Sequence, residues 1–175
     1  MQTAADDTRE LFQQHGPAVY RFVLMMLHHH QDAEDVVQET FLKLLNHLSA
    51  RGNTDNLRGW LFTVAAHAAR DRQRRRLRWM PWSAAAERSV DPSELPDEDG
   101  SLKAARAAML RLSGRDRMLL ALRANGLSYR DIAAATGIKE TSVGRLLARA
   151  LERWAKFTDD ARACASTNSI AGRIL

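Results

Sequence analysis

Apolar residues recur along most of the chain three and four positions apart, the spacing that places them on one face of an α-helix. No stretch shows the sustained alternation of apolar and polar residues that is typical of a half-buried strand. The pattern therefore predicts an all-α protein. The helical stripes contain Phe12, Val19, Phe22, Val23 and Met26, then Val37, Phe41, Leu44 and Leu48, and then Trp60, Leu61, Val64 and Ala68.

Three interruptions divide this pattern. Gly16-Pro17 breaks the first stripe and predicts that a fresh helix begins with Pro17 at its first position, where the missing N–H is tolerated. The polar residues 51–56 predict a turn-prone loop. Residues 80–100 contain three of the four prolines and five acidic residues between positions 91 and 99, so they predict an extended acidic linker.

A chain of 175 residues can hold two small domains, and the interruptions predict where they lie. We expect a first helical domain in residues 1–79 and a linker in residues 80–101. We expect a second helical domain in residues 102–160. No role is assigned to the tail of residues 161–175.

The second predicted domain contains a helix-turn-helix pattern in residues 127–138 and the helix that follows. Ser128 and Asp131 have the spacing of a capping box, which begins a helix. Gly137 stands where a left-handed residue ends one. In a helix-turn-helix the second helix enters the major groove of DNA by its N-terminal end. Its expected buried face contains Val143, Leu146, Leu147 and Leu151.

The start of this second helix carries side chains that can read DNA. Arginine can bind guanine in bidentate fashion, and glutamate can accept a hydrogen bond from cytosine. The alternative is a plain helical hairpin with a solvated charged face. The candidate DNA-reading residues are Lys139, Glu140, Thr141, Ser142 and Arg145, with Arg149 and Arg153 placed further along for phosphate contacts.

An arginine-rich segment ends the helix expected to begin near Leu57. A line of cations along one helix face can follow a phosphate backbone and release its counterions. A solvated helix end, where cations suit the helix dipole, is the alternative, but it needs only one or two cations. The arginines are at 70, 72, 74, 75, 76 and 78, and Thr63, His67, Arg70 and Arg74 share one stripe.

Composition narrows the class of protein. Lys and Arg number 26 against 21 Asp and Glu, and the net charge of +5 favours a polyanionic partner. No apolar run is long enough to span a bilayer, and the acidic N-terminus does not resemble a signal peptide. The single cysteine, Cys164, can form no internal disulfide. We therefore expect a cytoplasmic protein that does not insert into a membrane.

Histidines and carboxylates stand side by side in residues 28–41, HHHQDAEDVVQETF. The three histidines are consecutive, so their side chains spread apart, and only His30 and Glu34 have the spacing of a helical ligand pair. No nucleophile or cofactor motif accompanies the carboxylates. We therefore expect no metal, no cofactor and no catalytic residue here.

Capping explains part of this acidity. Asp32 at the N-cap and Asp35 at the third helical position would suit a helix N-terminus, but Glu39 lies beyond the first turn. Asp32, Asp35 and Glu39 share one face, opposite the apolar stripe. An acidic face on a basic protein predicts a basic protein partner.

Three segments together resemble one family. Residues 32–41 (DAEDVVQETF), residues 57–65 (LRGWLFTVA) with the following arginines, and residues 112–154 are similar to corresponding segments of bacterial group 4 sigma factors. These are the extracytoplasmic-function (ECF) type of the sigma-70 family. The resemblance extends from about Leu11 to Trp154. It implies a promoter-specificity subunit that binds core RNA polymerase and promoter DNA and helps open the minus-ten duplex.

The resemblance also implies roles for particular residues. Residues 51–56 correspond to the segment that captures a flipped minus-ten base, although on sequence alone an ordinary surface turn is the alternative. The implied minus-thirty-five contacts are Lys139, Glu140, Thr141, Ser142, Arg145 and Arg149. The implied contacts with the polymerase clamp helices are Asp32, Glu34, Asp35, Gln38, Glu39 and Phe41. The implied minus-ten contacts are Asn53, Thr54, Asp55, Asn56, Arg58, Trp60, Thr63, His67, Arg70, Arg74 and Arg75.

The chain departs from the family pattern at several positions. His67 stands where asparagine is common, and Ser113-Gly114 replaces a frequent proline pair. Lys139 takes the place of a capping serine, and Gly144 and Leu146 replace commonly basic residues. These differences concern the preferred promoter sequence and not the binding of DNA.

The linker must cover a considerable distance if both elements are bound at once. Its roughly 21 residues reach about 70 Å when fully extended, but average about 25 Å as a free coil. We therefore expect the free protein to be more compact than the bound one. The family further implies that an anti-sigma factor masks both domains.

An autonomous helix-turn-helix regulator is the second hypothesis. Such a protein would usually dimerise on a palindrome, and this sequence has no evident dimerisation helix. An enzyme built on the histidine and aspartate cluster is a third, and it would require a bound metal or turnover.

Overall fold

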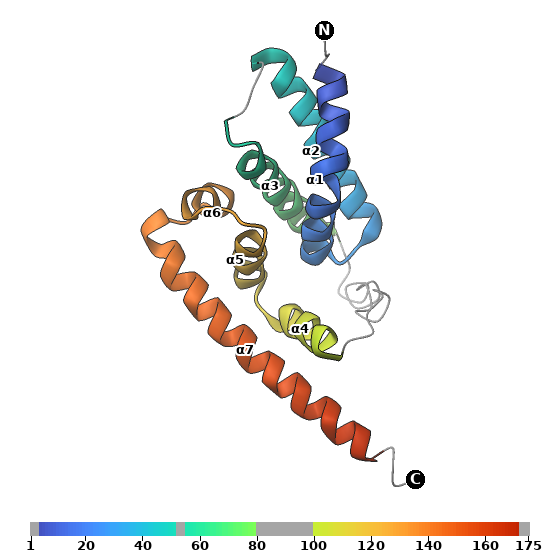
Figure 1. The fold of residues 1–175 in the computed structure, drawn as a ribbon, viewed down its shortest axis with the longest axis vertical. Coiled ribbons are helices and arrows are strands. Elements are labelled where there is room, and N and C mark those ends of the chain that lie inside the picture. Colours follow the sequence, from blue (N-terminus) through green and yellow to red (C-terminus); the bar gives the residue numbers. More distant parts are fainter. Residues whose placement is uncertain (1–3, 52–54, 80–99, 172–175) are drawn as a thin grey trace.

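The computed structural model describes residues 4–51, 55–79 and 100–171, and the side chains of residues 8–50, 55–75 and 104–160 within them. These ranges are helical apart from short connections and contain no strand, which confirms the all-α prediction. None of their helices is long and apolar enough to cross a bilayer. The helices are α1 (Ala4–Leu27), α2 (His30–Arg51), α3 (Leu57–Trp79), α4 (Gly100–Arg111), α5 (Gly114–Ala124), α6 (Tyr129–Thr136) and α7 (Glu140–Ala171) (Figure 1).

The predicted linker and tail are only partly covered by this description. Residues 80–99 lie outside it, whereas Gly100 and Ser101 already belong to α4. Helix α7 continues to Ala171, well into the predicted tail of residues 161–175.

Helices α1, α2 and α3 enclose an aromatic core. Phe22 of α1 and Phe62 of α3 meet edge to face, with ring centroids 5.3 Å apart and planes at 67°. Both side chains are almost fully buried, and each contributes roughly 1.5–3 kcal/mol of burial free energy. The stripe predicted for α2 is confirmed, since Val37, Phe41 and Leu44 are buried and Leu48 is half-buried.

Helix α1 runs unbroken through Pro17, so the prediction of a fresh helix at this residue is wrong. Proline inside a helix removes a hydrogen bond and usually costs about 3 kcal/mol. Packing on both sides of Pro17 opposes a break. Phe12 contacts the ring of Phe41 edge to face at 4.9 Å, and Val19 is fully buried.

Helices α6 and α7 form the predicted helix-turn-helix, and α5 packs against both of them. The Ser128 hydroxyl accepts from the Asp131 amide at 3.1 Å, and the Asp131 carboxylate accepts from the Ser128 amide at 3.3 Å, which confirms the capping box. Gly137 ends α6 in the left-handed region. The buried side chains of this domain include Leu119, Leu122, Leu127, Ile132, Val143 and Leu147.

One residue of the expected α7 stripe is misplaced. Leu151 is 53% exposed, whereas Ala150 is fully buried. The buried residues Val143, Leu147 and Ala150 have the spacing i, i+4, i+7, so the inward face of α7 passes through Ala150 and leaves Leu151 beside it.

Helix α4 packs against the middle of α7. The Trp154 indole donates to the Ala105 carbonyl at 3.1 Å. Arg111 lies over the Phe157 ring at 4.3 Å and pairs with Asp160 at 3.6 Å. These contacts join the first helix of the C-terminal half to its last.

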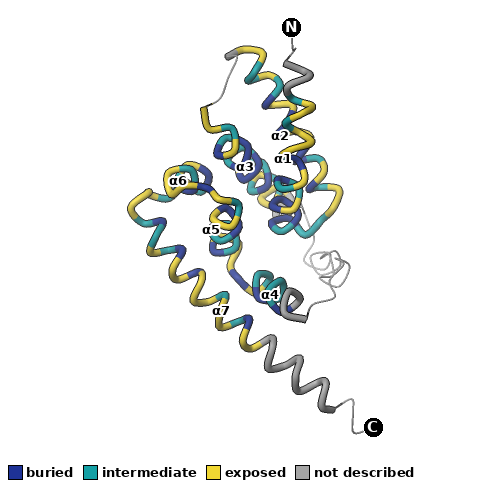
Figure 2. The backbone as a smooth tube through the Cα atoms, viewed as in Figure 1, coloured by how far each residue is buried: buried dark blue, intermediate teal, exposed yellow. Residues whose placement is uncertain are grey.

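The two halves of the chain pack directly against each other. Helix α6 lies beside α3, and α5 contacts α1 (Figure 1). Figure 2 shows buried stretches on the facing sides of these helices. Buried side chains from α1, α2, α3, α5, α6 and α7 form one continuous cluster.

Gly137 allows a test of the turn between α6 and α7. Its φ is 73°, and an added Cβ would meet no atom within 4 Å, so only the backbone would resist a side chain. We expect Gly137→Ala to lower the free energy of unfolding by about 1 kcal/mol in urea titrations. Gly114→Ala, which also meets no atom and has no positive φ, is the control. Equal stability of the two variants would contradict this account of the turn.

Candidate polymerase and nucleic-acid interfaces

The start of α2 is capped by a histidine. The His29 ring Nδ1 accepts from the Asp32 amide at 3.2 Å, and the His29 carbonyl accepts from Ala33 at 3.0 Å. The prediction of Asp32 as the N-cap is therefore wrong, because the helix begins two residues earlier, at His30. Asp32 instead lies in the first turn, where its charge still suits the helix dipole.

The other histidines of this cluster bind neighbouring side chains. The Tyr20 hydroxyl lies 2.8 Å from His30 Nδ1. His28 has a φ of 52°, and its Nε2 accepts from Arg117 of α5. Across the part of the chain that the structure describes, no group of three or more histidine, cysteine, aspartate and glutamate side chains could hold a metal ion.

An arginine of α3 partly neutralises the acidic face of α2. Arg72 Nη2 donates to Asp35 at 2.7 Å, and Arg72 Nε lies 3.6 Å from Asp32. Glu39 pairs with Lys43 on the same helix at 2.6 Å. Because these groups are substantially exposed, the pairs contribute little stability, about 0–1 kcal/mol each. They leave the carboxylates accessible to another cation.

The six residues predicted for polymerase binding are not equally accessible. Glu34, Gln38 and Glu39 are exposed, and Asp32 and Asp35 are half-buried. Phe41 is buried, and the ring against it, Phe12, is 46% exposed.

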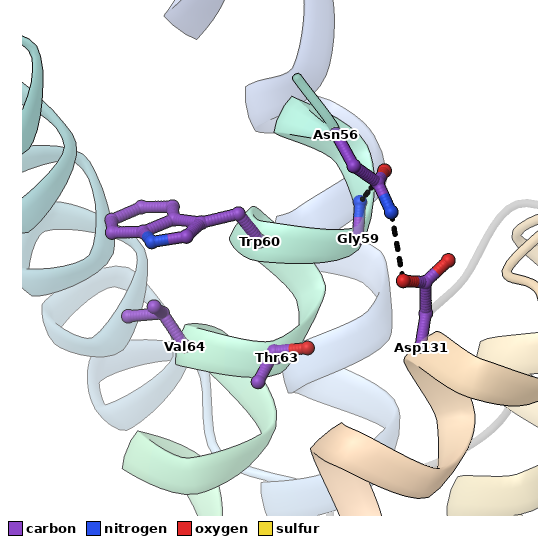
Figure 3. A pocket seen from close by; sticks show the side chains of 6 residues that line it. All are labelled: Asn56, Gly59, Trp60, Thr63, Val64 and Asp131. Atoms are coloured by element: carbon purple, nitrogen blue, oxygen red, sulfur yellow. Dashed lines mark hydrogen bonds between the residues drawn. The ribbon is translucent and has the colours of Figure 1, made fainter. Parts of the chain in front are cut away.

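The start of α3 is built around Asn56. Its side-chain oxygen accepts from the Gly59 amide at 2.9 Å, and its carbonyl accepts from Trp60 at 2.9 Å, so Asn56 is the N-cap. A pocket of about 330 Å³ opens beside it (Figure 3). The lining residues are Asn56, Gly59, Trp60, Thr63, Val64 and Asp131.

One wall of this pocket comes from the other half of the chain. Figure 3 shows Asn56 and Asp131 of α6 pointing toward each other, and Asn56 Nδ2 donates to Asp131 Oδ1 at 2.7 Å. Burial raises the pKa of Asp131, but hydrogen bonds from Ser128 and Asn56 and the nearby charge of Arg130 outweigh it and hold the pKa below its usual range. Asp131 is therefore a carboxylate acceptor at neutral pH.

The residues predicted for minus-ten contacts differ in their surroundings. Asn56, Arg58 and Arg70 donate to oxygens of α5 and α6, whereas Thr63 and Trp60 are half-buried beside the pocket. Asn53 and Thr54 lie outside the described residues. Asp55, His67, Arg74 and Arg75 are exposed, and so are Asn56 and Arg58.

The residues predicted for minus-thirty-five contacts gather at the open end of α7. Lys139, Glu140, Thr141, Arg145 and Arg149 are exposed, and Ser142 is half-buried. The Lys139 carbonyl accepts from the Ser142 amide at 2.9 Å. In Figure 1 the start of α7 is separated from α3 by α6.

Two residues near this surface differ from expectation. Arg153 donates to the buried carboxylate of Asp116 at 2.6 Å, so it is tied to α5 instead of projecting toward phosphate. Gly144 packs against Tyr129. An added Cβ would lie 3.3 Å from Tyr129 Cε2, so the glycine permits close approach of α6 to α7.

Sequence reasoning missed the residues that join the two halves. It treated Asp131 only as a cap, and it did not single out Arg117 or the carbonyls of Asn125 and Ala135. Backbone carbonyls carry no sequence signal. The second carboxylate oxygen of a capping aspartate, which can accept a further hydrogen bond, gives no sequence signal either.

Comparisons with known proteins cover most of the chain. The family profile described as Sigma-70 region 2 matches residues 11–79, and Sigma-70, region 4 matches residues 102–153. ECF RNA polymerase sigma factor SigL of Mycobacterium tuberculosis is 34% identical over 77% of this chain and 79% of its own length. RNA polymerase sigma factor CarQ of Myxococcus xanthus is 30% identical over 77% and 79%.

Two solved structures are similar in fold. Sigma factor RpoE in complex with the anti-sigma factor NepR, from Bartonella quintana, has a TM-score of 0.72 and 26% identity, and covers 88% of this chain and 98% of its own. CnrH in complex with the cytosolic domain of CnrY has a TM-score of 0.60 and 22% identity, and covers 87% and 88%.

The N-terminal match separates the two main hypotheses. An autonomous helix-turn-helix regulator has no need of a region 2 domain, and this chain devotes residues 11–79 to one. Both regions occur in the expected order, and curated relatives match across both of them. The chain therefore belongs to the sigma-70 family as a group 4, extracytoplasmic-function sigma factor, a promoter-recognition subunit of RNA polymerase.

Proposed function

We propose that each of the three surfaces described above carries out a different binding function of this sigma factor. The acidic face of α2 binds core polymerase, α3 and its pocket bind the minus-ten element, and the start of α7 reads the minus-thirty-five element. The observation that supports this division most strongly is the separation of charge. The carboxylates Asp32, Glu34, Asp35 and Glu39 lie along the first half of α2, whereas the exposed cations Arg74 and Arg75 lie on α3 and Lys139, Arg145 and Arg149 lie at or near the start of α7.

The polymerase surface consists of Glu34, Gln38 and Glu39 with the partly paired Asp32 and Asp35. A basic partner can replace the weak internal pairs at small cost because they are solvated. Phe41 is buried, so its proposed contribution is to hold α2 in place while Phe12 presents the accessible ring.

The minus-ten surface combines a pocket with a basic helix. Extruding a base from a duplex costs a few kcal/mol, which stacking and hydrogen bonds in the pocket must offset. The half-buried ring of Trp60 offers a stacking surface, and Asn56 and Thr63 offer polar groups. The exposed cations Arg74 and Arg75 suit the adjoining phosphates.

The minus-thirty-five surface is the N-terminal end of a long helix held by the capped turn of α6. Arg145 and Glu140 have the chemistry to read base edges, and Arg149 suits a phosphate. Lys139 supplies an exposed positive charge just before α7, which favours a phosphate contact at the groove edge.

Regulation and location follow as proposals. The structural relatives RpoE and CnrH were solved with NepR and CnrY. We infer that this chain too is held by an anti-sigma factor, and that it works in the cytoplasm, where polymerase is found. We also infer that it carries no catalytic activity of its own and that polymerase supplies the chemistry.

Initiation by reconstituted enzyme tests this proposal. Purified core RNA polymerase is incubated with the full chain and genomic DNA fragments, and the 5′ ends of the transcripts are sequenced. We expect discrete start sites that require the chain and that share two upstream motifs. A set of 5′ ends unchanged by addition of the chain would contradict the function.

A further inference from the structure

The indole of Trp60 contacts a ring from another helix. The imidazole of His47, near the end of α2, lies against it with ring centroids 5.2 Å apart and planes at 36°. Aromatic rings in proteins pair at about 4.5–7 Å between centroids, so this is a direct ring contact. Trp60 also lines the pocket beside Asn56. The same indole therefore contacts α2 and belongs to the pocket in which we propose that the extruded base binds.

Helix α3 alone gives this indole little lateral support. Gly59, which precedes Trp60, has no side chain. The Asn56 amide, one turn earlier, accepts from Gly59 at 2.9 Å and donates to Asp131 at 2.7 Å. Figure 3 shows the Asn56 side chain and the Trp60 indole pointing in different directions, with Val64 one turn later on the indole side. A half-buried indole has several staggered rotamers available unless a neighbouring element blocks them.

His47 can supply this support because its own position is fixed by the core. Leu44, one turn earlier on α2, is fully buried, and Leu48 is half-buried. Residues three positions apart share a helix face, so His47 lies at the edge of this buried stripe. Its half-buried side chain extends from there to the indole of Trp60. The core thereby sets the position of the imidazole.

A fixed indole is important for binding a base. Stacking requires the faces of the aromatic ring and the base to meet. A side chain that is mobile before binding loses conformational freedom when the base arrives, and this loss lowers the affinity. Holding the indole of Trp60 in place therefore increases the affinity for a base without adding any contact to the base itself.

The phosphate contacts of the minus-ten surface do not depend on this ring pair. Arg74 and Arg75 lie on the same helix, about 21 Å further along α3 than Trp60 at 1.5 Å per residue. Their exposed guanidinium groups suit phosphates whatever the orientation of the indole. The contributions of bases and phosphates to binding can therefore be measured separately.

We propose that His47 is a positioning residue of the minus-ten pocket: its imidazole packs against Trp60 and holds the indole in the orientation that receives an extruded base. The proposal rests on the proposed function of this pocket. His47 contacts no DNA in it and acts through Trp60. Helix α2 then serves two proposed surfaces, the polymerase surface through its first half and the DNA surface through His47.

Three substitutions separate positioning from general stability. His47→Ala removes the imidazole, and His47→Phe retains an aromatic ring at the same place. Asn46→Ala is the control, because it changes the exposed neighbouring residue of the same helical turn. His47→Ala is also combined with Trp60→Ala, so that the coupling between the two rings can be measured.

The first measurement reports on the indole directly and involves neither DNA nor polymerase. The full chain is labelled with 5-fluorotryptophan, and the fluorine NMR signal of Trp60 is the one that is absent from Trp60→Phe. We expect this signal to move toward that of free 5-fluorotryptophan in His47→Ala and to remain displaced from it in His47→Phe. The signals of the other three tryptophans should not move, whereas a general loss of structure would move them as well.

The second measurement separates base stacking from phosphate contacts. The chain is bound to core RNA polymerase, and fluorescence anisotropy gives the affinity for a labelled 15-nucleotide single strand of mixed sequence and for an abasic strand of the same length. Core polymerase alone gives the background. The ratio of the two affinities is the preference for bases, because both strands carry the same phosphates.

We expect His47→Ala to lower the preference for bases about three- to ten-fold, the range that corresponds to ordering one side chain on binding. His47→Phe and Asn46→Ala should stay within about two-fold of the parent chain. The affinity for the abasic strand should be unchanged in all three variants. Trp60→Ala should lower the preference about ten-fold or more. In that background His47→Ala should have no further effect.

The proposal is overturned if the Trp60 signal is unchanged in His47→Ala, or if His47→Ala lowers the preference for bases equally with and without the indole. Loss of the preference in Trp60→Ala without any loss in His47→Ala would overturn this proposal and leave the proposed function of the pocket intact. Retention of the preference in Trp60→Ala would overturn the assignment of the pocket, and this proposal with it.

Discussion

Replacing Asp35 and Glu39 with arginine is expected to abolish recruitment to core RNA polymerase. The double variant changes the charge of the α2 face by four units, and both carboxylates are accessible. Like charges facing each other across an interface cost several kcal/mol. Affinity for core polymerase, measured by anisotropy of the labelled chain, should fall at least about 100-fold, which corresponds to roughly 2.7 kcal/mol.

The same variant should retain its DNA contacts. Neither residue lies near α7, so binding of a labelled duplex through the helix-turn-helix should persist. Asp159→Arg with Glu152→Arg, on an exposed part of α7, makes the same charge change elsewhere and should leave polymerase affinity within a few-fold. Equal loss in the two double variants, or loss in neither, would argue against α2 as the polymerase surface.

Phe62→Ala is expected to be the most destabilising single substitution proposed here. The ring is 1% exposed and packs edge to face on Phe22 at the centre of the N-terminal core. Removing a buried phenylalanine ring typically costs 3–5 kcal/mol, from lost transfer free energy and from the cavity that remains. Urea unfolding followed by circular dichroism should show a loss of about 4 kcal/mol.

Leu42→Ala provides the contrast. Leu42 is 62% exposed, and its removal should change the free energy of unfolding by less than about 0.5 kcal/mol. A small effect of Phe62→Ala would mean that the ring does not support the domain. It would also weaken the view that α1 and α3 share one core.

Local signals in the sequence predicted much of the C-terminal half. Ser128, Asp131 and Gly137 act through bonds to residues three or four positions away, so the sequence contains both partners. The apolar stripe of α2 is likewise readable, because one face of that helix packs against a single neighbouring layer. Such features depend on spacing alone.

The incorrect predictions concern features that depend on packing between residues far apart in the sequence. Pro17 stays inside α1 because Phe12 and Val19 are held by other contacts. The cap of α2 moves to His29, whose ring nitrogen does the work expected of a carboxylate. Leu151 is exposed because the inward face of α7 passes through Ala150 after Leu147.

The candidate sites show the same division. Residue types and helical spacing placed Arg145 and Glu39 on accessible surfaces. They could not reveal that Arg72 would pair with Asp35, or that Arg70 would bind the Ala135 carbonyl. The last contact joins residues 65 positions apart through a backbone atom, and no pattern of side chains encodes it.

Because α4 packs against the middle of α7, movement of α4 would also move the distant N-terminal end of this long helix. At 1.5 Å per residue, the 32 residues of α7 extend about 48 Å. The N-terminal end of α7, which we propose binds DNA, and the part that contacts α4 through Trp154 and Asp160 therefore belong to one stiff helix. A displacement of α4 at Gly100 would therefore be transmitted along α7 to its N-terminal end. The position of α4 would then set the angle at which α7 enters the DNA major groove in our proposal.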